Sequence, residues 1–448
     1  MGRLFGTDGV RGIANDGLGC ELATEIGRAA ATLLSDGAHR PLFVIGSDTR
    51  ASSPMLIAAL AAGISSVGAD VMLLGVVPTP AVAYLTVKYG ASAGVMISAS
   101  HNPAEYNGIK LFGANGYKLP DMLEERIEDM ILEKTPSPVL AAGGDVGGIS
   151  LAERALDDYT NYIVSTATAS LDGLDIAIDT ANGSASVTAK GIFERLGATV
   201  HMINDTPNGT NINKNCGSTH LGAVSEFVRD NHLYCGVAFD GDADRCLFVD
   251  ENGEEIDGDV IMAICALDLK KRGKLNKDTV VGTIMTNFGF SKFCDEHRLR
   301  FVATRVGDRY VLDQMLLDGL SFGGEQSGHL IFKEYATTGD GQLTAVQLLS
   351  IAKRESLPIS ELARVMTRYP QITENVTVSP EGKINFYKDE IISERIEEAK
   401  RALGDTGRIV VRPSGTEPLI RVMTEGSDTR LTESIAKEIA DVIKARLG

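Results

Sequence analysis

The sequence predicts an α/β protein made of three similar successive units and a separate small α+β domain. Short apolar runs without alternation, such as 42–45, 71–74 and 94–97, are typical of strands covered on both faces of a mostly parallel sheet. The same order of strands and helices then recurs twice along the chain. After about Tyr369 the pattern changes to alternating residues, which indicates a different kind of domain.

In the first unit, Ser53 and Pro54 are expected to begin a helix, and Gly68 is expected to end it. A strand over 71–74 follows directly. The stretch 55–77 is apolar enough to suggest a membrane span, but Gly63 and Asp70 interrupt it. We interpret it as a buried helix followed by a buried strand.

The second unit has predicted strands at 176–178, 200–203 and 236–239, with a helix ending near Gly197. The third has predicted strands at 280–283, 301–304 and 320–322. In each unit a polar segment follows the third strand, and these segments are 98–103, 240–245 and 324–329. Because ligands in α/β sheets bind at the carboxyl ends of strands, we expect the three segments to meet in one cleft. The alternative is the chance periodicity of any α/β protein.

The last part of the chain has predicted strands at 372–378, 409–412 and 419–423. A loop at 413–418 separates the last two strands, and residues 431–447 have helical spacing. We interpret this part as the small α+β domain.

Composition limits the possible partners and the compartment. With 43 Lys and Arg against 60 Asp and Glu, the 448-residue chain has a formal charge of -17, which makes nucleic acid and anionic membrane poor candidates. The six cysteines are scattered without a C-x-x-C pair, so we expect reduced thiols. The N-terminal residues do not resemble a secretory signal, and the expected location is the cytoplasm.

Asp240, Asp242 and Asp244 alternate at the end of a predicted strand, where a tight loop can direct all three carboxylates at one hard cation such as Mg²⁺. Glu251 stands at the twelfth position of an EF-hand pattern, which would bind Ca²⁺. Arg245 occupies the sixth position, where that loop needs glycine. The pattern therefore favours a magnesium loop, and a solvated acidic turn is the other alternative.

Ser100 and His101 follow the apolar run 94–97 and are expected at the edge of the cleft. A serine hydrolase is one interpretation, but no G-x-S-x-G motif surrounds Ser100. A turn or a helix cap is the structural alternative. Lys110, close by in the sequence, adds a cation that alone would be taken for a surface lysine.

The segment 412–418 combines hydroxyl groups, a glycine and a guanidinium, and Arg421 follows shortly after it. These are the components of a phosphate-binding nest, although an ordinary hairpin loop fits equally well. The chain has no Walker A motif, so ATP-driven chemistry is unsupported. The turns 7–12 and 305–309 are glycine-containing and charged, and neither is informative by itself.

Taken together and in this order, five motifs resemble the active-site set of the α-D-phosphohexomutase superfamily over essentially the whole chain. The motifs are Thr-Asp-Gly-Val-Arg-Gly, Ser-Ala-Ser-His-Asn-Pro, Asp-Gly-Asp-Ala-Asp-Arg, Gly-Glu-Gln-Ser-Gly-His and Arg-Pro-Ser-Gly-Thr-Glu-Pro. The opening motif and the segment Val-Gly-Asp-Arg-Tyr310 look most like the branch that acts on glucosamine phosphates. The other branches commonly carry His at the place of Asp308, which puts an acid/base role at this position in doubt.

The resemblance implies that Ser100 carries a phosphoryl group and, with Asp240, Asp242 and Asp244, binds one Mg²⁺ per subunit. The enzyme would interconvert glucosamine 6-phosphate and glucosamine 1-phosphate through glucosamine 1,6-bisphosphate. The implied groups for proton transfer and charge stabilisation are His101, Lys110, His329, Arg11 and Arg245. The implied residues for binding the sugar and its phosphate are Arg305, Gly307, Glu325, Ser327, Arg412, Ser414, Gly415, Thr416 and Arg421.

The implied fold is three doubly wound, mixed-sheet α/β domains in tandem plus a smaller C-terminal α+β domain, around a central cleft. We place the domains at 1–155, 156–255, 256–368 and 369–448. A homodimer is the assembly considered. The alternatives are a phosphomannomutase or phosphoglucomutase, a Mg²⁺-dependent sugar phosphatase, and a phosphosugar-sensing binding protein on the same scaffold.

Overall fold

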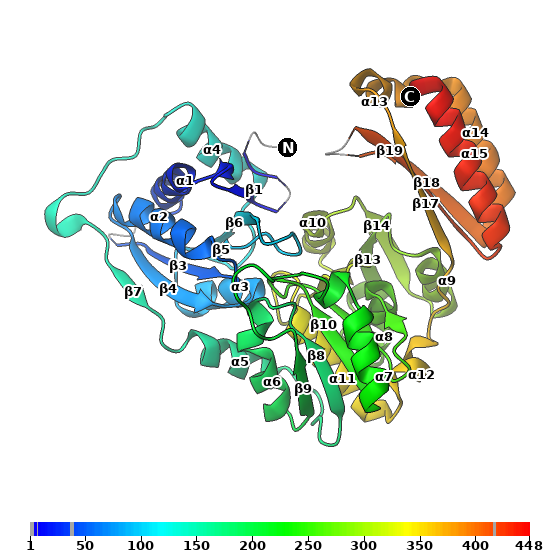
Figure 1. The fold of residues 1–448 in the computed structure, drawn as a ribbon, viewed down its shortest axis with the longest axis horizontal. Coiled ribbons are helices and arrows are strands. Elements are labelled where there is room, and N and C mark those ends of the chain that lie inside the picture. The colour runs from blue at the N-terminus through cyan, green and yellow to red at the C-terminus, as the bar shows by residue number, and fades with distance from the viewer. Residues whose placement is uncertain (1–3, 7, 36–39, 415–417) are drawn as a thin grey trace.

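The computed structural model describes residues 4–6, 8–35, 40–414 and 418–448. Figure 1 shows four domains along the chain, and the C-terminal domain stands on the far side of the molecule from most of the first domain. In the described part of the chain, no helix has both the length and the apolar character needed to cross a membrane.

The first domain is built on a seven-stranded sheet with the order β2-β1-β6-β5-β3-β4-β7. Its helices α1 and α2 pack against each other, and α3 packs against β3 and β5. The elements are β1 (Val10–Ala14), β2 (Gly17–Leu18), α1 (Cys20–Leu33), β3 (Leu42–Ser47), α2 (Ser53–Ser65), β4 (Asp70–Val76), α3 (Thr79–Lys88), β5 (Ala93–Ile97), β6 (Tyr106–Gly113), α4 (Asp121–Leu132) and β7 (Ile149–Leu151).

The second domain contains a five-stranded sheet with the order β12-β11-β10-β8-β9. Helix α7 packs against β8 and β10, and helix α6 packs against β9. The elements are α5 (Ala155–Ser165), β8 (Asp175–Asp179), α6 (Ala189–Arg195), β9 (Thr199–Ile203), α7 (Gly222–Asn231), β10 (Cys235–Phe239), β11 (Cys246–Val249) and β12 (Glu255–Ile256).

The third domain has a four-stranded sheet with the order β14-β13-β15-β16. Helix α10 packs against β13 and β15, and helix α11 packs against α8 of the same domain and α5 of the second. The elements are α8 (Gly258–Lys271), β13 (Thr279–Thr283), α9 (Phe288–Glu296), β14 (Arg300–Thr304), α10 (Asp308–Asp318), β15 (Phe322–Gly324), β16 (Leu330–Phe332), α11 (Gly341–Glu355) and α12 (Ile359–Ala363).

The three sheets share one topology, which confirms the predicted repeat. The shared part is a four-stranded core, formed by β3, β4, β5 and β6 in the first domain, by β8, β9, β10 and β11 in the second, and by β13, β14, β15 and β16 in the third. In each core the first strand pairs in parallel with the second and the third, and the third pairs with an antiparallel fourth. The antiparallel pairs are β5 with β6, β10 with β11, and β15 with β16. The polar segments after the third strands are therefore tight connections between antiparallel neighbours, and each lies at a carboxyl end of its parallel strands.

The C-terminal domain has an antiparallel sheet of order β17-β19-β18, covered by helices α14 and α15. Its hydrophobic core is separate from the core that extends from the first to the third domain. The elements are β17 (Gln371–Thr377), α13 (Pro380–Asn385), α14 (Glu390–Leu403), β18 (Gly407–Pro413), β19 (Leu419–Gly426) and α15 (Thr429–Leu447).

A small polar junction joins this domain to the third. The buried carboxylate of Glu425 in β19 accepts hydrogen bonds from the backbone N–H of Phe288 at 3.0 Å and from Arg408 Nε at 2.6 Å. The rings of Phe288 and Tyr369 meet edge to face at 5.4 Å. The C-terminal core is separate, so this polar junction links two independently packed parts of the chain.

The structure corrects some predicted elements. Helix α2 begins at Ser53 with Ser52 before it as N-cap, and Ser52 makes no capping hydrogen bond with its side chain. The predicted strand at 320–322 is shifted, since β15 runs over Phe322–Gly324. The fourth strands β6, β11 and β16 were not predicted as elements.

Candidate active site

Ser100 lies just after β5, in a connection that we call the serine loop, residues 98–105. Its φ of 51° is in the left-handed region, which is uncommon for a residue with a side chain and is typical of functional turns. The Ser98 hydroxyl accepts a hydrogen bond from the Ser100 N–H at 2.9 Å and donates one to Asp48 at 2.5 Å. These bonds fix the backbone at the point where the side chain of Ser100 turns toward the second domain.

Arg50 supports the serine loop through hydrogen bonds to its backbone, and the sequence alone did not indicate this role. Its guanidinium is buried, is paired with Asp48 at 2.9 Å, and donates to the carbonyl oxygens of Ser100 at 2.9 Å and Asn102 at 2.8 Å. Asn213 of the second domain donates to the same two carbonyls, at 2.9 and 3.0 Å. The loop is therefore held by two domains at once, as expected for a preorganised site.

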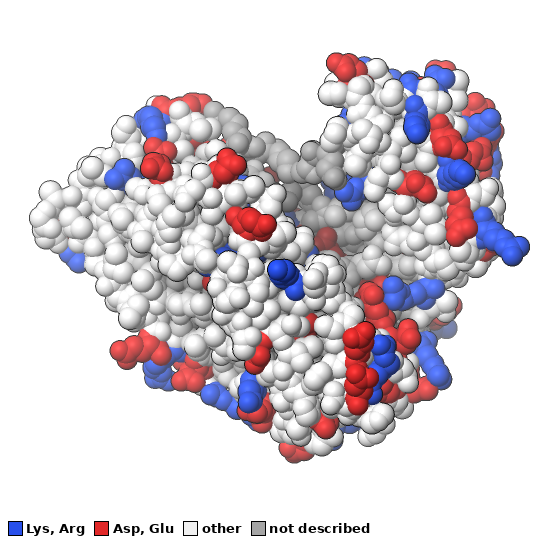
Figure 2. Space-filling view, in the orientation of Figure 1, with Lys and Arg blue, Asp and Glu red and all other residues white. Residues whose placement is uncertain are grey.

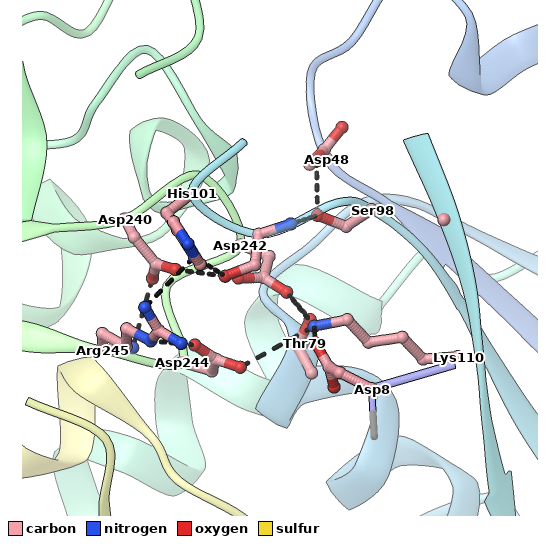
Figure 3. Close-up of polar contacts among 12 residues, drawn as sticks. Asp8, Asp48, Thr79, Ser98, His101, Lys110, Asp240, Asp242, Asp244 and Arg245 are labelled. Atoms are coloured by element: carbon pink, nitrogen blue, oxygen red, sulfur yellow. Dashed lines mark hydrogen bonds and ion pairs between the residues drawn. The ribbon is translucent and has the colours of Figure 1, made fainter. Parts of the chain in front are cut away.

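Asp240, Asp242 and Asp244 lie in the connection between β10 and β11, which we call the metal loop, residues 240–245. All three are buried, and each offers a carboxylate oxygen within 4.8 Å of the others. Ala243 has a φ of 57°, so the backbone curls tightly and directs alternate side chains to one point. Figure 3 shows the three carboxylates gathered around the position of the serine loop.

The electrostatics of this cluster fit a bound cation. Burial, together with Asp244 and Asp242, raises the pKa of Asp240 well above its usual range. Oδ1 of Asp242 and Oδ1 of Asp244 are buried and accept no hydrogen bond from the described residues, although Arg245 Nε lies 3.9 Å from the latter. Buried, crowded carboxylate oxygens without hydrogen bonds are costly unless a cation satisfies them, and oxygen ligands are those that Mg²⁺ prefers. The residues present therefore fit a divalent metal ion.

Ser100 reaches this cluster directly. Its Oγ donates a hydrogen bond to Asp240 Oδ2 at 2.7 Å, and both side chains are buried. Gly241 makes this approach possible, because a Cβ at that position would lie 2.6 Å from the carbonyl oxygen of Ser100. Three predicted metal ligands and the predicted nucleophile are thus brought together.

Lys110 extends from β6 to the opposite side of the cluster. Its buried Nζ lies 2.7 Å from Asp242, 2.9 Å from Asp8 and 3.8 Å from Asp244. Burial would lower the pKa of Lys110, but Asp242 and Asp8 raise it above its usual value. Lys110 is therefore a permanent cation in this state of the site, and Thr79 supports Asp242 with a hydrogen bond of 2.6 Å.

His101 and Arg245 lie beside Ser100. Nδ1 of His101 is 3.3 Å from Ser100 Oγ and 3.1 Å from Arg245 Nη1. Burial, with Arg245 and Arg11 nearby, lowers the pKa of His101 to about 4. The imidazole is thus neutral near pH 7, and its Nδ1 accepts from the guanidinium. Arg11 is paired with Asp8.

His329 is buried at the edge of the metal loop. Its Nδ1 lies 3.6 Å from Asp244 and its Nε2 lies 3.6 Å from Asp308. The backbone N–H of Gly339 donates to Nε2 at 3.1 Å, which assigns the ring proton to Nδ1, facing Asp244. The structure thus places His329 against a predicted metal ligand.

The third domain contributes the connection between β15 and β16, residues 325–329. Glu325 is half-buried and accepts a hydrogen bond from the Gly307 N–H at 3.0 Å, which joins two predicted sugar-binding turns. Ser327 is half-buried in the same connection, and the exposed Arg305 lies over the ring of Tyr310 at 5.5 Å.

Arg412 and Arg421 face each other across β18 and β19 as directly paired residues. Burial and the charge of Arg421 lower the pKa of Arg412. Like charges at opposed positions of two strands are destabilising, so a bound anion would relieve the pair. Ser414 comes directly after β18, and its carbonyl oxygen accepts a hydrogen bond from Lys383 Nζ at 2.6 Å. Gly415 and Thr416 lie outside the described residues.

Among the described residues, Arg412, Ser414 and Arg421 of the C-terminal domain make no hydrogen bond or ion pair with the metal loop that the structure records. Figure 2 shows the molecular face hollowed between the C-terminal domain and the first domain. Arg412 lies near the end of β18 and Arg421 near the start of β19, at the end of the sheet where these two strands are connected.

Sequence analysis also missed residues that complete the site. Asp8 binds Lys110, and Lys118 binds both Asp8 and Asp308. Asp8 and Asp308 belong to the segments 7–12 and 305–309, and neither segment indicates a function from its sequence alone. Lys118 stood next to no motif, so no sequence signal pointed to it.

With this geometry established, comparison with known proteins defines the family. Family models for phosphoglucomutase/phosphomannomutase match all four parts of the chain. They are α/β/α domain I at residues 2–137, α/β/α domain II at 156–253, α/β/α domain III at 257–369 and the C-terminal domain at 362–442. The chain therefore belongs to the phosphoglucomutase/phosphomannomutase family.

Relatives of similar length define a narrower group. A phosphoglucosamine mutase of Acetivibrio thermocellus is 52% identical over 449 residues, covering 100% of both chains. Phosphoglucosamine mutases of Clostridium novyi and Caldanaerobacter subterraneus are 51% and 52% identical, each over 100% of this chain and over 99% and 100% of their own.

Solved structures show the same fold. A phosphoglucomutase/phosphomannomutase family protein of Burkholderia thailandensis superposes with a TM-score of 0.83 at 22% identity, covering 100% of this chain and 99% of its own. A phosphomannomutase-like protein of Thermus thermophilus superposes with a TM-score of 0.79 at 21% identity, covering 99% and 100%. At these identities the similarity supports the four-domain fold alone.

Proposed function

We propose that the protein is a phosphoglucosamine mutase, an isomerase that interconverts glucosamine 6-phosphate and glucosamine 1-phosphate by intramolecular phosphoryl transfer. The observation that carries the proposal is the contact of Ser100 Oγ with Asp240 at 2.7 Å, inside a cluster of three buried carboxylates. About half of the residues are identical, over the full chain, to those of relatives named phosphoglucosamine mutase. This sequence identity supports glucosamine phosphate as the substrate.

In the first half-reaction, phosphorylated Ser100 donates its phosphoryl group to the free hydroxyl at C1 of glucosamine 6-phosphate. The bond between phosphorus and Ser100 Oγ breaks, a bond between phosphorus and the sugar O1 forms, and the hydroxyl proton ends on Ser100 Oγ. The product of this step is glucosamine 1,6-bisphosphate. Lys110 and His329 both approach Oδ2 of Asp244 in the metal loop; we propose His329 for proton transfer and the charged Lys110 for charge stabilisation.

In the second half-reaction the bisphosphate is bound in the opposite orientation. Ser100 Oγ attacks the phosphorus at C6, its proton passes to the sugar O6, and glucosamine 1-phosphate leaves. Arg245 and the neutral His101 lie within 3.1 Å of each other beside Ser100 and are placed to bind the transferring phosphoryl oxygens. Arg11 is proposed to stabilise charge from the same side.

Asp240, Asp242, Asp244 and the phosphate on Ser100 would hold one Mg²⁺. When bound, the ion spreads the negative charge that develops on the phosphoryl oxygens during transfer. The protein's own contribution is to place Ser100 against these ligands and to exclude water, which would otherwise hydrolyse the phosphoserine.

The phosphate that does not react is assigned to Arg412, Ser414, Gly415, Thr416 and Arg421. Because the substrate presents either phosphate in turn, one site on the C-terminal domain serves both orientations. Glu325 and Ser327 are proposed to bind the sugar hydroxyls, beside Arg305 and Gly307. Movement of the C-terminal domain at its junction near Glu425 would bring these groups to the reacting centre.

Assays with several substrates test the proposal. Purified protein with Mg²⁺ and a trace of hexose 1,6-bisphosphate is incubated with the 6-phosphates of glucosamine, glucose and mannose. The proposal predicts a kcat/KM that is highest for glucosamine 6-phosphate, with almost no inorganic phosphate released. Preference for glucose or mannose would identify the other mutases, and stoichiometric phosphate release would identify a phosphatase.

Ser100→Ala separates the mutase from a sugar-binding protein without catalysis. A mutase loses nearly all turnover in this variant, while a binding protein keeps its affinity and never had turnover. We further propose the domain boundaries 1–155, 156–255, 256–368 and 369–448, a location in the cytoplasm, and a homodimer that binds no nucleic acid. Limited proteolysis and light scattering test the boundaries and the assembly.

A further inference from the structure

A chain of alternating charges runs behind the active site and connects three domains. It begins at Asp242 of the second domain, passes through Lys110 at 2.7 Å and Asp8 at 2.9 Å, and continues to Lys118 at 2.6 Å and Asp308 at 2.5 Å. Lys110, Asp8 and Lys118 belong to the first domain, and Asp308 begins helix α10 of the third. Figure 3 shows the part of this chain from Asp242 to Asp8.

Asp8 is shared by the two lysines in a specific way. Lys118 Nζ binds its Oδ1, whereas Lys110 Nζ and the guanidinium of Arg11 share its Oδ2, so among these cations Lys118 alone holds Oδ1. Without Lys118, Oδ1 loses this ion pair and the carboxylate can turn about its χ2 angle, while Oδ2 keeps Lys110 and Arg11. Asp242 holds the Lys110 ammonium from the metal loop, and Lys118 sets the orientation of its other partner, Asp8.

The backbone at Lys118 and at Gly9 packs against β6. Lys118 is bridged to Phe112 at the end of β6, the strand that carries Lys110. The segment with Asp8 lies directly against the same strand, because a Cβ at Gly9 would lie 2.3 Å from the carbonyl oxygen of Ile109. The Lys118 side chain is 9% exposed, so its two ion pairs are shielded from water.

We propose that Lys118 is a positioning residue of the active site, which bridges Asp8 and Asp308 and thereby holds the Lys110 ammonium against the carboxylates of the metal loop. This inference rests on the proposed mutase function and deepens it. Lys118 acts through Asp8, and it connects the turn at 305–309 of the third domain to the phosphoryl-transfer centre.

The same interface contains a matched control. Arg309, next to Asp308, binds Glu124 at 2.9 Å and the carbonyl oxygen of Leu119 at 2.6 Å, and it is also paired with Asp121. Arg309 thus joins the same two domains without touching Asp8. Arg309→Met loosens the interface, whereas Lys118→Met removes the link to Lys110 as well.

A cavity next to Lys118 allows a second kind of test. Its volume is about 710 Å³, it lies between the first and third domains, and Lys118 and Asp308 form part of its wall together with apolar side chains such as Leu119 and Leu312. Truncation to Lys118→Ala would open a channel from this cavity to Asp8. A small primary amine such as butylamine can then occupy the place of the lysine.

The expected results follow from misplacement of a charged group near the reacting atoms. Lys118→Met lowers kcat by about 100-fold with little change in KM for glucosamine 6-phosphate. We expect Arg309→Met and Lys118→Met to lower the melting temperature by similar amounts. Arg309→Met, however, keeps kcat within about threefold of the wild type. Butylamine restores kcat of Lys118→Ala by about tenfold or more, and butanol of the same length does not.

Three results would overturn the inference. They are an unchanged kcat in Lys118→Met, an equal loss of kcat in Arg309→Met, and equal rescue by butanol and butylamine, because each indicates a merely structural lysine. If Lys118→Ala does not fold, the comparison of the two methionine variants decides alone. Failure of the proposed function is distinguishable, since then the wild type itself would not interconvert the two glucosamine phosphates.

Discussion

Ser100 Oγ lies 2.7 Å from Asp240 Oδ2, although 140 positions separate the two residues in the chain. The serine loop of the first domain and the metal loop of the second interlock at this point, because Gly241 leaves room for the Ser100 carbonyl. A phosphoryl group on Ser100 would therefore lie beside the carboxylate cluster, in place of the hydrogen bond between Ser100 and Asp240.

Gly241→Ala tests this close packing. The added Cβ would lie 2.6 Å from the Ser100 carbonyl oxygen, so the serine loop must move away from the metal loop. We expect kcat to fall by about 100-fold and unfolding to become easier by about 1–3 kcal/mol, as measured by steady-state kinetics and denaturant titration. The control is Gly222→Ala, where no described atom outside the adjoining backbone of its helix lies within 4 Å of the new Cβ, and normal activity is expected. Full activity in Gly241→Ala would contradict the interlocked arrangement.

Asp240→Asn tests the metal cluster. Burial and the neighbouring carboxylates raise the pKa of Asp240, so removal of its charge should relieve repulsion in protein treated with chelator. The melting temperature of the metal-free variant is expected to equal or exceed that of metal-free wild type. Addition of Mg²⁺ should raise the melting temperature of the wild type only, because binding to the folded state stabilises it. A similar Mg²⁺ response in both proteins would show that the cation binds elsewhere.

His101 gives a pH dependence with a definite sign. Its pKa falls from 6.5 to about 4 on folding, so the unfolded chain binds more protons between these values. The neutral imidazole therefore contributes stability that is present above pH 6.5 and is lost as the pH falls toward 4. Relative to His101→Gln, the wild type is expected to lose about 1–2 kcal/mol of unfolding free energy between pH 7 and pH 5. An NMR titration of the imidazole with a midpoint near 6.5 would contradict this.

Arg412→Met is expected to separate stability from substrate binding. Because Arg412 and Arg421 are directly opposed on β18 and β19, loss of one charge relieves repulsion and should not lower the melting temperature. Loss of a charged hydrogen bond to phosphate should raise KM for glucosamine 6-phosphate by about tenfold or more. The exposed Arg430→Met serves as control. Unchanged KM in Arg412→Met would remove this pair from the phosphate site.

Much of the fold was predictable because each unit repeats a local pattern. Apolar runs without alternation marked β3, β5, β8 and β13, and glycines marked the ends of helices. The strand β6 was missed because Asn107 and Lys110 interrupt its apolar run, and both side chains are buried by tertiary contacts. Local sequence cannot indicate that the charge of a buried lysine is balanced by carboxylates from distant parts of the chain.

The same limit explains which site residues were predictable. Asp240, Asp242 and Asp244 occupy alternate positions of one short segment, so their spacing alone predicts that their carboxylates point to one site. Lys118 acquires its environment from Asp8 and Asp308, which are 110 and 190 positions away. Such a residue shows its role only when the chain is folded.

Phosphate mapping by mass spectrometry tests most directly whether Ser100 carries the transferred phosphoryl group. Metal-loaded protein is first incubated with a hexose 1,6-bisphosphate. We predict one phosphoryl group on Ser100 of the wild type, its loss to glucosamine 6-phosphate added afterwards, and none in Ser100→Ala. A phosphoryl group on another residue, or turnover of glucosamine 6-phosphate by Ser100→Ala at the wild-type rate, would contradict this role of Ser100.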